Sequence, residues 1–135
     1  MADASGGQTS LAGAKGLKCA FPVYATGTWQ NGEARGEVKT ATLTLSFTSI
    51  DTDDGTAQSV DRFGPAEITV RLVGGSLHFM QIGTSSALYV TTVFSKETRA
   101  GKRQAVHTRH EYTEISLPGF TSRPEQYYGE CDVVP

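Results

Sequence analysis

Apolar and polar residues alternate along much of the chain, and the clearest example lies at residues 39–49. The apolar residues there occupy one set of alternate positions, and threonines and serines fill the other: Ala41, Leu43, Leu45 and Phe47 alternate with Thr40, Thr42, Thr44, Ser46 and Thr48. Successive side chains of a β-strand point to opposite faces, so this period of two predicts a half-buried strand. No stretch shows the 3.6-residue period of an amphipathic helix.

A two-residue hairpin is predicted at Gly74-Gly75. The glycine pair separates two alternating segments, residues 66–73 and 76–82, and such pairs favour tight turns that need positive φ. Opposite residues of an antiparallel pair share a face, so the register follows from pairing Val73 with Ser76. It places Leu72 opposite Leu77, Val70 opposite Phe79 and Ile68 opposite Gln81 on one face, and Arg71 opposite His78 on the face toward water.

Five further segments are predicted as strands: residues 17–24, 56–62, 87–94, 102–112 and 125–133. Their short connections favour antiparallel neighbours, because a parallel crossover takes a dozen or more residues. We therefore expect an all-β fold of about eight antiparallel strands in a closed or nearly closed up-and-down β-barrel, with a two-sheet β-sandwich as the alternative. Residues 1–16, rich in Gly, Ala and Ser, are expected to form a disordered tail before a single β domain at residues 17–135.

The charge balance narrows the range of partners. The chain has 135 residues, with twelve basic and fourteen acidic side chains and an isoelectric point near 5.9. Such a chain has no positive field to attract a polyanion, so we expect no nucleic-acid partner. No apolar run reaches the roughly 20 residues of a membrane-spanning helix, and we expect a monomer without a transmembrane segment.

The two cysteines predict a disulfide. Cys19 lies in the first predicted strand and Cys131 in the last. A bridge requires Cα atoms within about 7 Å, so this bond would make the terminal strands neighbours, as in a closed barrel. Disulfides persist in oxidising compartments, and we therefore expect an exported protein, periplasmic or secreted, whose signal peptide lies outside the sequence as given. Two buried, reduced cysteines in a cytosolic domain are the alternative.

The string Gly27-Thr28-Trp29 resembles the Gly-x-Trp signature of lipocalins, and it also occurs in avidin-type barrels. In those families the motif lies at the entry to the first barrel strand, and its Trp packs over the closed end of the barrel. The resemblance implies a small ligand bound in the barrel mouth. The alternative is an unrelated β core in which Trp29, the only tryptophan, covers one end.

The densest acidic cluster is Asp51, Asp53, Asp54 and Asp61. Its spacing does not fit an EF-hand, which needs Gly at position 6 and Glu at position 12 of the loop. We expect a solvated hairpin turn at Asp53-Asp54-Gly55 and no metal site.

The best candidates for a ligand site lie on one strand, in residues 102–112. Alternation places His107 and Arg109 on one face with Ala105, and His110 and Tyr112 on the other with Val106. Because Val106 is the larger apolar residue, we expect its face to point inward. The predicted ligand-binding residues are His107, Arg109, His110 and Tyr112, and an inward His110 would make binding depend on pH between about 5 and 8.

The function is not established by any motif. The chain has no nucleophile elbow, no Cys-His arrangement and no cofactor motif. We expect a non-enzymatic, exported β-barrel domain that binds a small molecule, a peptide or an envelope protein, with Tyr127-Tyr128 and the loop at residues 117–124 as possible rim residues. The alternatives are a small hydrolase-like enzyme that uses His107 or His110 with a distant carboxylate, and a purely structural domain.

Overall fold

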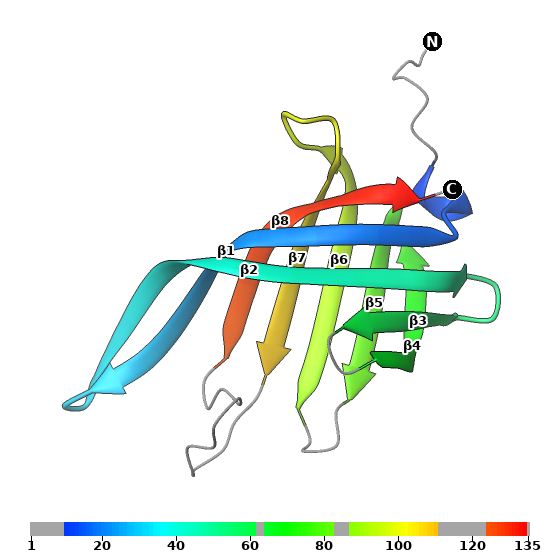
Figure 1. Ribbon diagram of the computed structural model, residues 1–135. Helices are drawn as coiled ribbons and strands as arrows, with labels where there is room; N and C mark the ends of the chain where they lie inside the picture. Colours follow the sequence, from blue (N-terminus) through cyan, green and yellow to red (C-terminus); the bar gives the residue numbers. More distant parts are fainter. Residues whose placement is uncertain (1–9, 62–63, 83–86, 111–123, 135) are drawn as a thin grey trace.

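The computed structural model describes residues 10–61, 64–82, 87–110 and 124–134. These residues form eight β-strands in chain order: β1 (Gly16–Gln30), β2 (Glu33–Asp51), β3 (Thr56–Asp61), β4 (Gly64–Val73), β5 (Ser76–Ile82), β6 (Leu88–Glu97), β7 (Arg103–His110) and β8 (Glu125–Val134). Each strand pairs antiparallel with the next, and β1 also pairs with β8 (Figure 1). The predicted all-β up-and-down barrel is confirmed, because the strands form one ring-like sheet rather than two packed sheets.

The hairpin between β4 and β5 has the predicted register. Val73 lies opposite Ser76, and the ladder continues through Leu72 with Leu77, Arg71 with His78 and Val70 with Phe79. The two turn residues, Gly74 and Gly75, have φ of 58° and 85°, which glycine adopts without strain.

The core fills one part of the barrel interior. Buried apolar residues of all eight strands form it: Leu17, Cys19, Phe21, Leu45, Phe47, Ile50, Ala57, Ile68, Val70, Leu77, Phe79, Val93, Ala105 and Cys131. The rings of Phe47 and Phe79 stack at a centroid distance of 4.1 Å. A 3₁₀ turn, η1 (Leu11–Gly13), places Leu11 in the same cluster. Leu11 and Ala14 of this segment are buried, and β1 begins at Gly16; residues 1–9 lie outside the described residues.

The predicted disulfide is confirmed. Cys19 of β1 and Cys131 of β8 stand directly opposite each other, with Cα atoms 4.0 Å apart, and their sulfur atoms are bonded. Both cysteines are buried. The bond therefore links the first and last strands, where the barrel closes, away from solvent.

A bulge bends β1 where it passes β8. Phe21 and Pro22 together lie opposite Gly129, between the pairs Ala20–Glu130 and Val23–Tyr128. A Cβ on Gly129 would come within 2.0 Å of the Ala20 carbonyl oxygen, so only glycine lets the two backbones approach this closely. Pro22 suits the bulge because it has no N–H to donate to a ladder.

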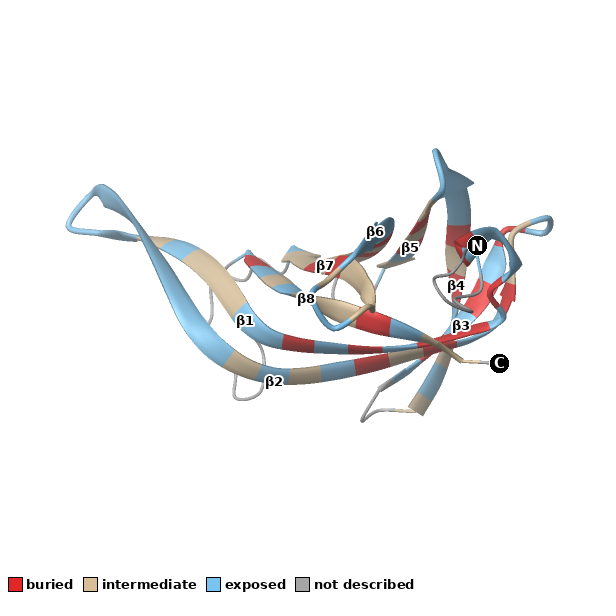
Figure 2. Cartoon of the chain, turned by 90° about the horizontal axis from the view of Figure 1, so that it is seen from above, coloured by how far each residue is buried: buried red, intermediate tan, exposed pale blue. Residues whose placement is uncertain are grey.

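Beyond the bulge, β1 and β2 continue as a two-stranded arm that projects from the barrel (Figures 1 and 2). We call residues 26–37 the arm; Asn31 and Gly32, with φ of 51° and 82°, form the turn at its tip. The strands predicted from the sequence end at residue 24 and resume at residue 39, so they do not include the arm. Trp29 lies on the arm with 70% of its surface exposed, and the expectation that it packs over a barrel end is wrong.

Asp51, Asp53 and Asp54 of the acidic cluster lie at the expected turn between β2 and β3, whereas Asp61 is the last residue of β3. One carboxylate oxygen of Asp51 accepts hydrogen bonds from the backbone N–H groups of Asp53 and Asp54, both at 3.0 Å. Asp53 and Asp54 are themselves exposed to solvent. The part of the chain that the structure describes contains no helix long and apolar enough to cross a membrane.

Candidate functional site

Polar side chains face the barrel interior on β6, β7 and β8. Thr91 precedes the inward Val93 by two residues on β6, and His107 follows the inward Ala105 by two residues on β7. Both polar residues are buried, and they stand directly opposite each other. At the level of Thr91 and His107, the side chains inside the barrel change from the apolar residues of the core to residues that form hydrogen bonds.

The structure corrects the predicted orientation of β7. His107 is 4% exposed and faces inward, whereas His110 is exposed and Val106 is only half-buried. The small side chain of Ala105 points inward because it packs opposite the buried Val93. Val106 lies opposite Tyr128, which is exposed on the outer surface, and Tyr112 falls outside the described residues.

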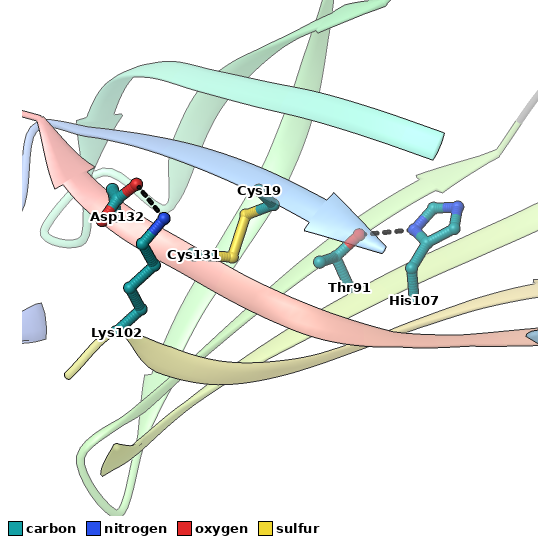
Figure 3. The surroundings of a disulfide bond; sticks show 6 residues. All are labelled: Cys19, Thr91, Lys102, His107, Cys131 and Asp132. Atoms are coloured by element: carbon teal, nitrogen blue, oxygen red, sulfur yellow. Dashed lines mark hydrogen bonds and ion pairs between the residues drawn. A yellow bond between two sulfur atoms is a disulfide. The ribbon is translucent and has the colours of Figure 1, made fainter. Parts of the chain in front are cut away.

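Two hydrogen bonds determine the tautomer of His107. The Arg109 Nε–H donates to His107 Nε2 at 3.1 Å, so this nitrogen must be an acceptor without a proton. His107 Nδ1 then carries the hydrogen and donates to Thr91 Oγ1 at 2.7 Å (Figure 3). Burial, and next the positive charge of Arg109, lower the pKa of His107 to about 3. The imidazole is therefore neutral at physiological pH, and it does not titrate between pH 5 and 8 as the sequence analysis expected for an inward histidine.

Arg109 lies between two aromatic rings. Its guanidinium carbon is 5.5 Å from the ring centre of Tyr89 and 5.4 Å from that of Tyr127, within the range of cation–π attraction. The side chain is partly exposed, and no ion pair among the described residues includes it. Its position is thus fixed by two rings and an imidazole, while its charge has no carboxylate within ion-pair distance in this part of the chain.

Tyr127 and Glu125 complete the cluster from β8. The Tyr127 hydroxyl donates to a Glu125 carboxylate oxygen at 2.7 Å. Burial, then this hydrogen bond and the negative charge of Glu125, raise the pKa of Tyr127, so the hydroxyl keeps its proton. Glu125 lies opposite Arg109 in the ladder, yet its carboxylate is held by the tyrosine. On the other side, Tyr24 stacks on Tyr127 with ring centres 5.2 Å apart.

The cluster combines charged, hydrogen-bonding and aromatic groups from four strands. Its members offer guanidinium donors, a carboxylate and aromatic faces, and none is a serine, a lysine or a free thiol. Both imidazole nitrogens of His107 are engaged in hydrogen bonds, so this residue has no free lone pair to accept a proton from a substrate. Of the four predicted ligand-binding residues, the structure brings together His107 and Arg109 and leaves His110 outside. Tyr24, Tyr89 and Glu125 were not singled out from the sequence, because they lie on other strands. Pairing of β7 with β6 and β8 places Tyr89 and Glu125 opposite Arg109, and closure of the barrel between β1 and β8 places Tyr24 against Tyr127.

A separate hollow of about 230 Å³ lies at the level of the disulfide, next to the outward residues Lys18, Glu130 and Asp132. Lys102, which also lines the hollow, forms an ion pair with Asp132 at 3.2 Å (Figure 3) and a second with Glu130 at 3.8 Å. Lys102 is thus paired with carboxylates, whereas Arg109 in the interior cluster forms no ion pair among the described residues. The hollow therefore offers a charged ligand fewer unpaired groups than the interior cluster does.

Comparison with known proteins finds no matching family model, no similar curated protein and no similar solved structure.

Proposed function

We propose that this protein is an exported binding protein whose barrel interior holds a small molecule through an anionic group bound by Arg109. The observation that carries the proposal is the environment of the guanidinium: two tyrosine rings and an imidazole hold it in place, and no described carboxylate pairs with it. A cation oriented in this way, at low conformational cost, is suited to an anionic ligand.

The contacts of Arg109 also indicate how a ligand would bind. The Nε–H of Arg109 already donates a hydrogen bond to His107, so the terminal N–H groups of the guanidinium are the ones that would donate to a ligand. Two parallel N–H groups of a guanidinium match the two oxygens of a carboxylate or a phosphate. The tyrosines on either side of the guanidinium, together with Tyr24, provide flat apolar surfaces for a planar ligand body.

The disulfide supports an oxidising location. Bonds of this kind form and persist in secreted or periplasmic proteins and are rare in the cytosol of mesophiles. The Cys19–Cys131 bond is buried and joins the terminal strands, which is typical of a structural disulfide rather than a redox switch.

The proposal is tested by titrating the purified, oxidised protein with benzoate, phenyl phosphate and neutral benzamide, with NMR detection of the Arg109 Nε–H signal. We expect the two anions to shift this signal in a saturable way and benzamide to bind roughly tenfold more weakly or worse, since a charge-assisted hydrogen bond contributes more than a neutral one. Arg109→Gln should lower the affinity for benzoate by a similar factor.

Arg99→Gln provides the matched control, because Arg99 is exposed in the turn between β6 and β7. It should bind benzoate as the wild type does. Equal affinity for benzamide and benzoate, or benzoate binding that survives Arg109→Gln, would rule out an anion site at Arg109. Native mass spectrometry of protein from an oxidising expression host would show whether a small molecule copurifies.

A further inference from the structure

The outer edge of β2 is unpaired along the arm. Every residue of β2 from Glu33 to Lys39 lies opposite a residue of β1, but β3 pairs with β2 only from Ser46 onward. On the side away from β1, residues 33–45 therefore have no neighbouring strand among the described residues. An edge of this length presents a row of backbone N–H and C=O groups that another strand can pair with.

The two faces of this edge differ in chemistry. Glu33, Arg35, Glu37 and Lys39 alternate in sign along one face, where Arg35 pairs with Glu33 at 3.9 Å and Lys39 with Glu37 at 3.0 Å. The other face carries Ala34, Gly36 and Val38, and Val38 is 74% exposed. Trp29, also on this apolar face, lies opposite Ala34.

This edge is complementary to itself in the antiparallel direction. If two copies of β2 pair about a two-fold axis at Gly36, residue numbers of opposite residues add up to 72. The pairs are then Glu33 with Lys39 and Arg35 with Glu37 on one face, and Ala34 with Val38 on the other. Each pair occurs twice because of the symmetry, so all eight charged side chains face a residue of opposite sign.

The neighbouring registers lack this match. A slip by two residues in one direction puts Glu33 opposite Glu37 and Arg35 opposite its own copy. A slip in the other direction puts Arg35 opposite Lys39 and Glu37 opposite its own copy. Opposite like charges destabilise an antiparallel pair, and an odd slip would bring the charged face against the apolar face.

We propose that two copies of this chain associate through the β2 edges of their arms, in antiparallel register about Gly36, to form a four-stranded ribbon. The arm carries this edge away from the barrel body (Figures 1 and 2). In the ribbon, Trp29 and Ala34 of one copy lie in one row with Val38 of the second copy, and this row covers apolar surface that is exposed in the single chain. The proposed dimer replaces the monomer expected from the sequence and does not depend on the proposed ligand site.

Charge reversal tests the register. Arg35→Glu places Glu opposite Glu37, and Glu37→Arg places Arg opposite Arg35, so each variant alone should dimerise roughly tenfold more weakly than wild type or worse. An equimolar mixture of the two variants restores opposite charges at both positions and should form a heterodimer. The chain that carries both substitutions should again form a homodimer.

Sedimentation velocity measures the dimer, and the fluorescence of Trp29, the only tryptophan of the chain, reports on burial of the arm. Lys96→Glu and Glu67→Arg are the matched controls, because they make the same charge changes at exposed residues outside the arm. Circular dichroism checks that each variant is folded.

We expect the wild type to be dimeric at micromolar concentration and its dimer to weaken at about 1 M salt, where charges are screened within about 3 Å. The controls should match the wild type. The proposal is overturned by a wild type that is monomeric at roughly 100 µM, where even weak specific dimers form. It is equally overturned by a dimer that Arg35→Glu and Glu37→Arg leave intact, or by a mixture that associates no better than its components.

Discussion

His107 Nδ1 lies 2.7 Å from Thr91 Oγ1, across the ladder in which these two buried residues stand directly opposite each other. The bond fixes the imidazole with Nε2 directed at the Arg109 Nε–H. A threonine on β6 thereby determines the position of a guanidinium on β7, with the imidazole as the link.

Thr91→Val should destabilise the protein by roughly 1–3 kcal/mol, because the buried Nδ1–H of His107 loses its acceptor. A change of tautomer cannot compensate, since Nε2 has to accept from Arg109. Thr92→Val is the control, because it removes the 3.0 Å hydrogen bond between Thr92 and the half-buried His78. Water can replace the threonine hydroxyl there, so this variant should lose less stability than Thr91→Val. Urea unfolding of both variants measures the difference, and equal losses would contradict the buried network.

Stability should fall in acid because of His107. Its pKa is about 3 in the folded protein and near 6.5 in the unfolded chain, so between these values the unfolded chain binds a proton that the folded chain does not. The free energy of unfolding therefore decreases as pH falls from 6.5 to 3, by on the order of 4–5 kcal/mol in total, and this contribution is fully present above pH 6.5.

His107→Gln should flatten that pH dependence, because glutamine does not titrate, while His78→Gln should leave it in place. Urea unfolding at pH 4, 5, 6 and 7 gives the slopes. An unchanged slope in His107→Gln would mean that other groups cause the acid loss.

Removing the disulfide should lower stability without changing the fold. The bond links residues 112 positions apart, and the loss of chain entropy in the unfolded state corresponds to roughly 4–5 kcal/mol. The double variant Cys19→Ala with Cys131→Ala should keep the barrel, because the β1–β8 ladder extends well beyond the bond. Alkylation of the oxidised wild type without reductant should label no thiol, and two labelled cysteines would disprove the bond.

The Gly74-Gly75 turn should not tolerate valine. Both residues have positive φ, and a β-branched side chain there strains the backbone by roughly 1–3 kcal/mol per residue. Gly13→Val is the control, since a Cβ at Gly13 meets nothing within 4 Å and its φ is not positive. Thermal unfolding compares the variants, and NOEs between Val70 and Phe79 verify the register in the wild type. A double valine variant as stable as the control would contradict the turn geometry.

Alternation was sufficient to locate strands wherever one face is buried. The segment predicted at 76–82 coincides with β5, because its period of two is regular and a glycine pair marks its start. The arm escaped detection because both of its faces are exposed, so its small apolar residues give a weak pattern. The Asn31-Gly32 pair between alternating residues was the available signal for it.

The orientation of β7 was ambiguous in the sequence for a different reason. Each set of alternate positions contains one apolar residue, Ala105 or Val106, and residue size does not decide which set faces inward. That choice depends on the strands on either side, where Ala105 packs opposite Val93 and Val106 lies opposite Tyr128.

The chain's own sequence determined the strands that have one buried face, the glycine turn and the Cys19–Cys131 pairing, because local periodicity, turn chemistry and a single possible pairing carry that information. Only the tertiary structure decided that Arg109 lies between Tyr89 and Tyr127 and that His107 binds Thr91. These contacts join side chains of three neighbouring strands, and their geometry depends on strand register and on which face of β7 points inward, neither of which local periodicity determines.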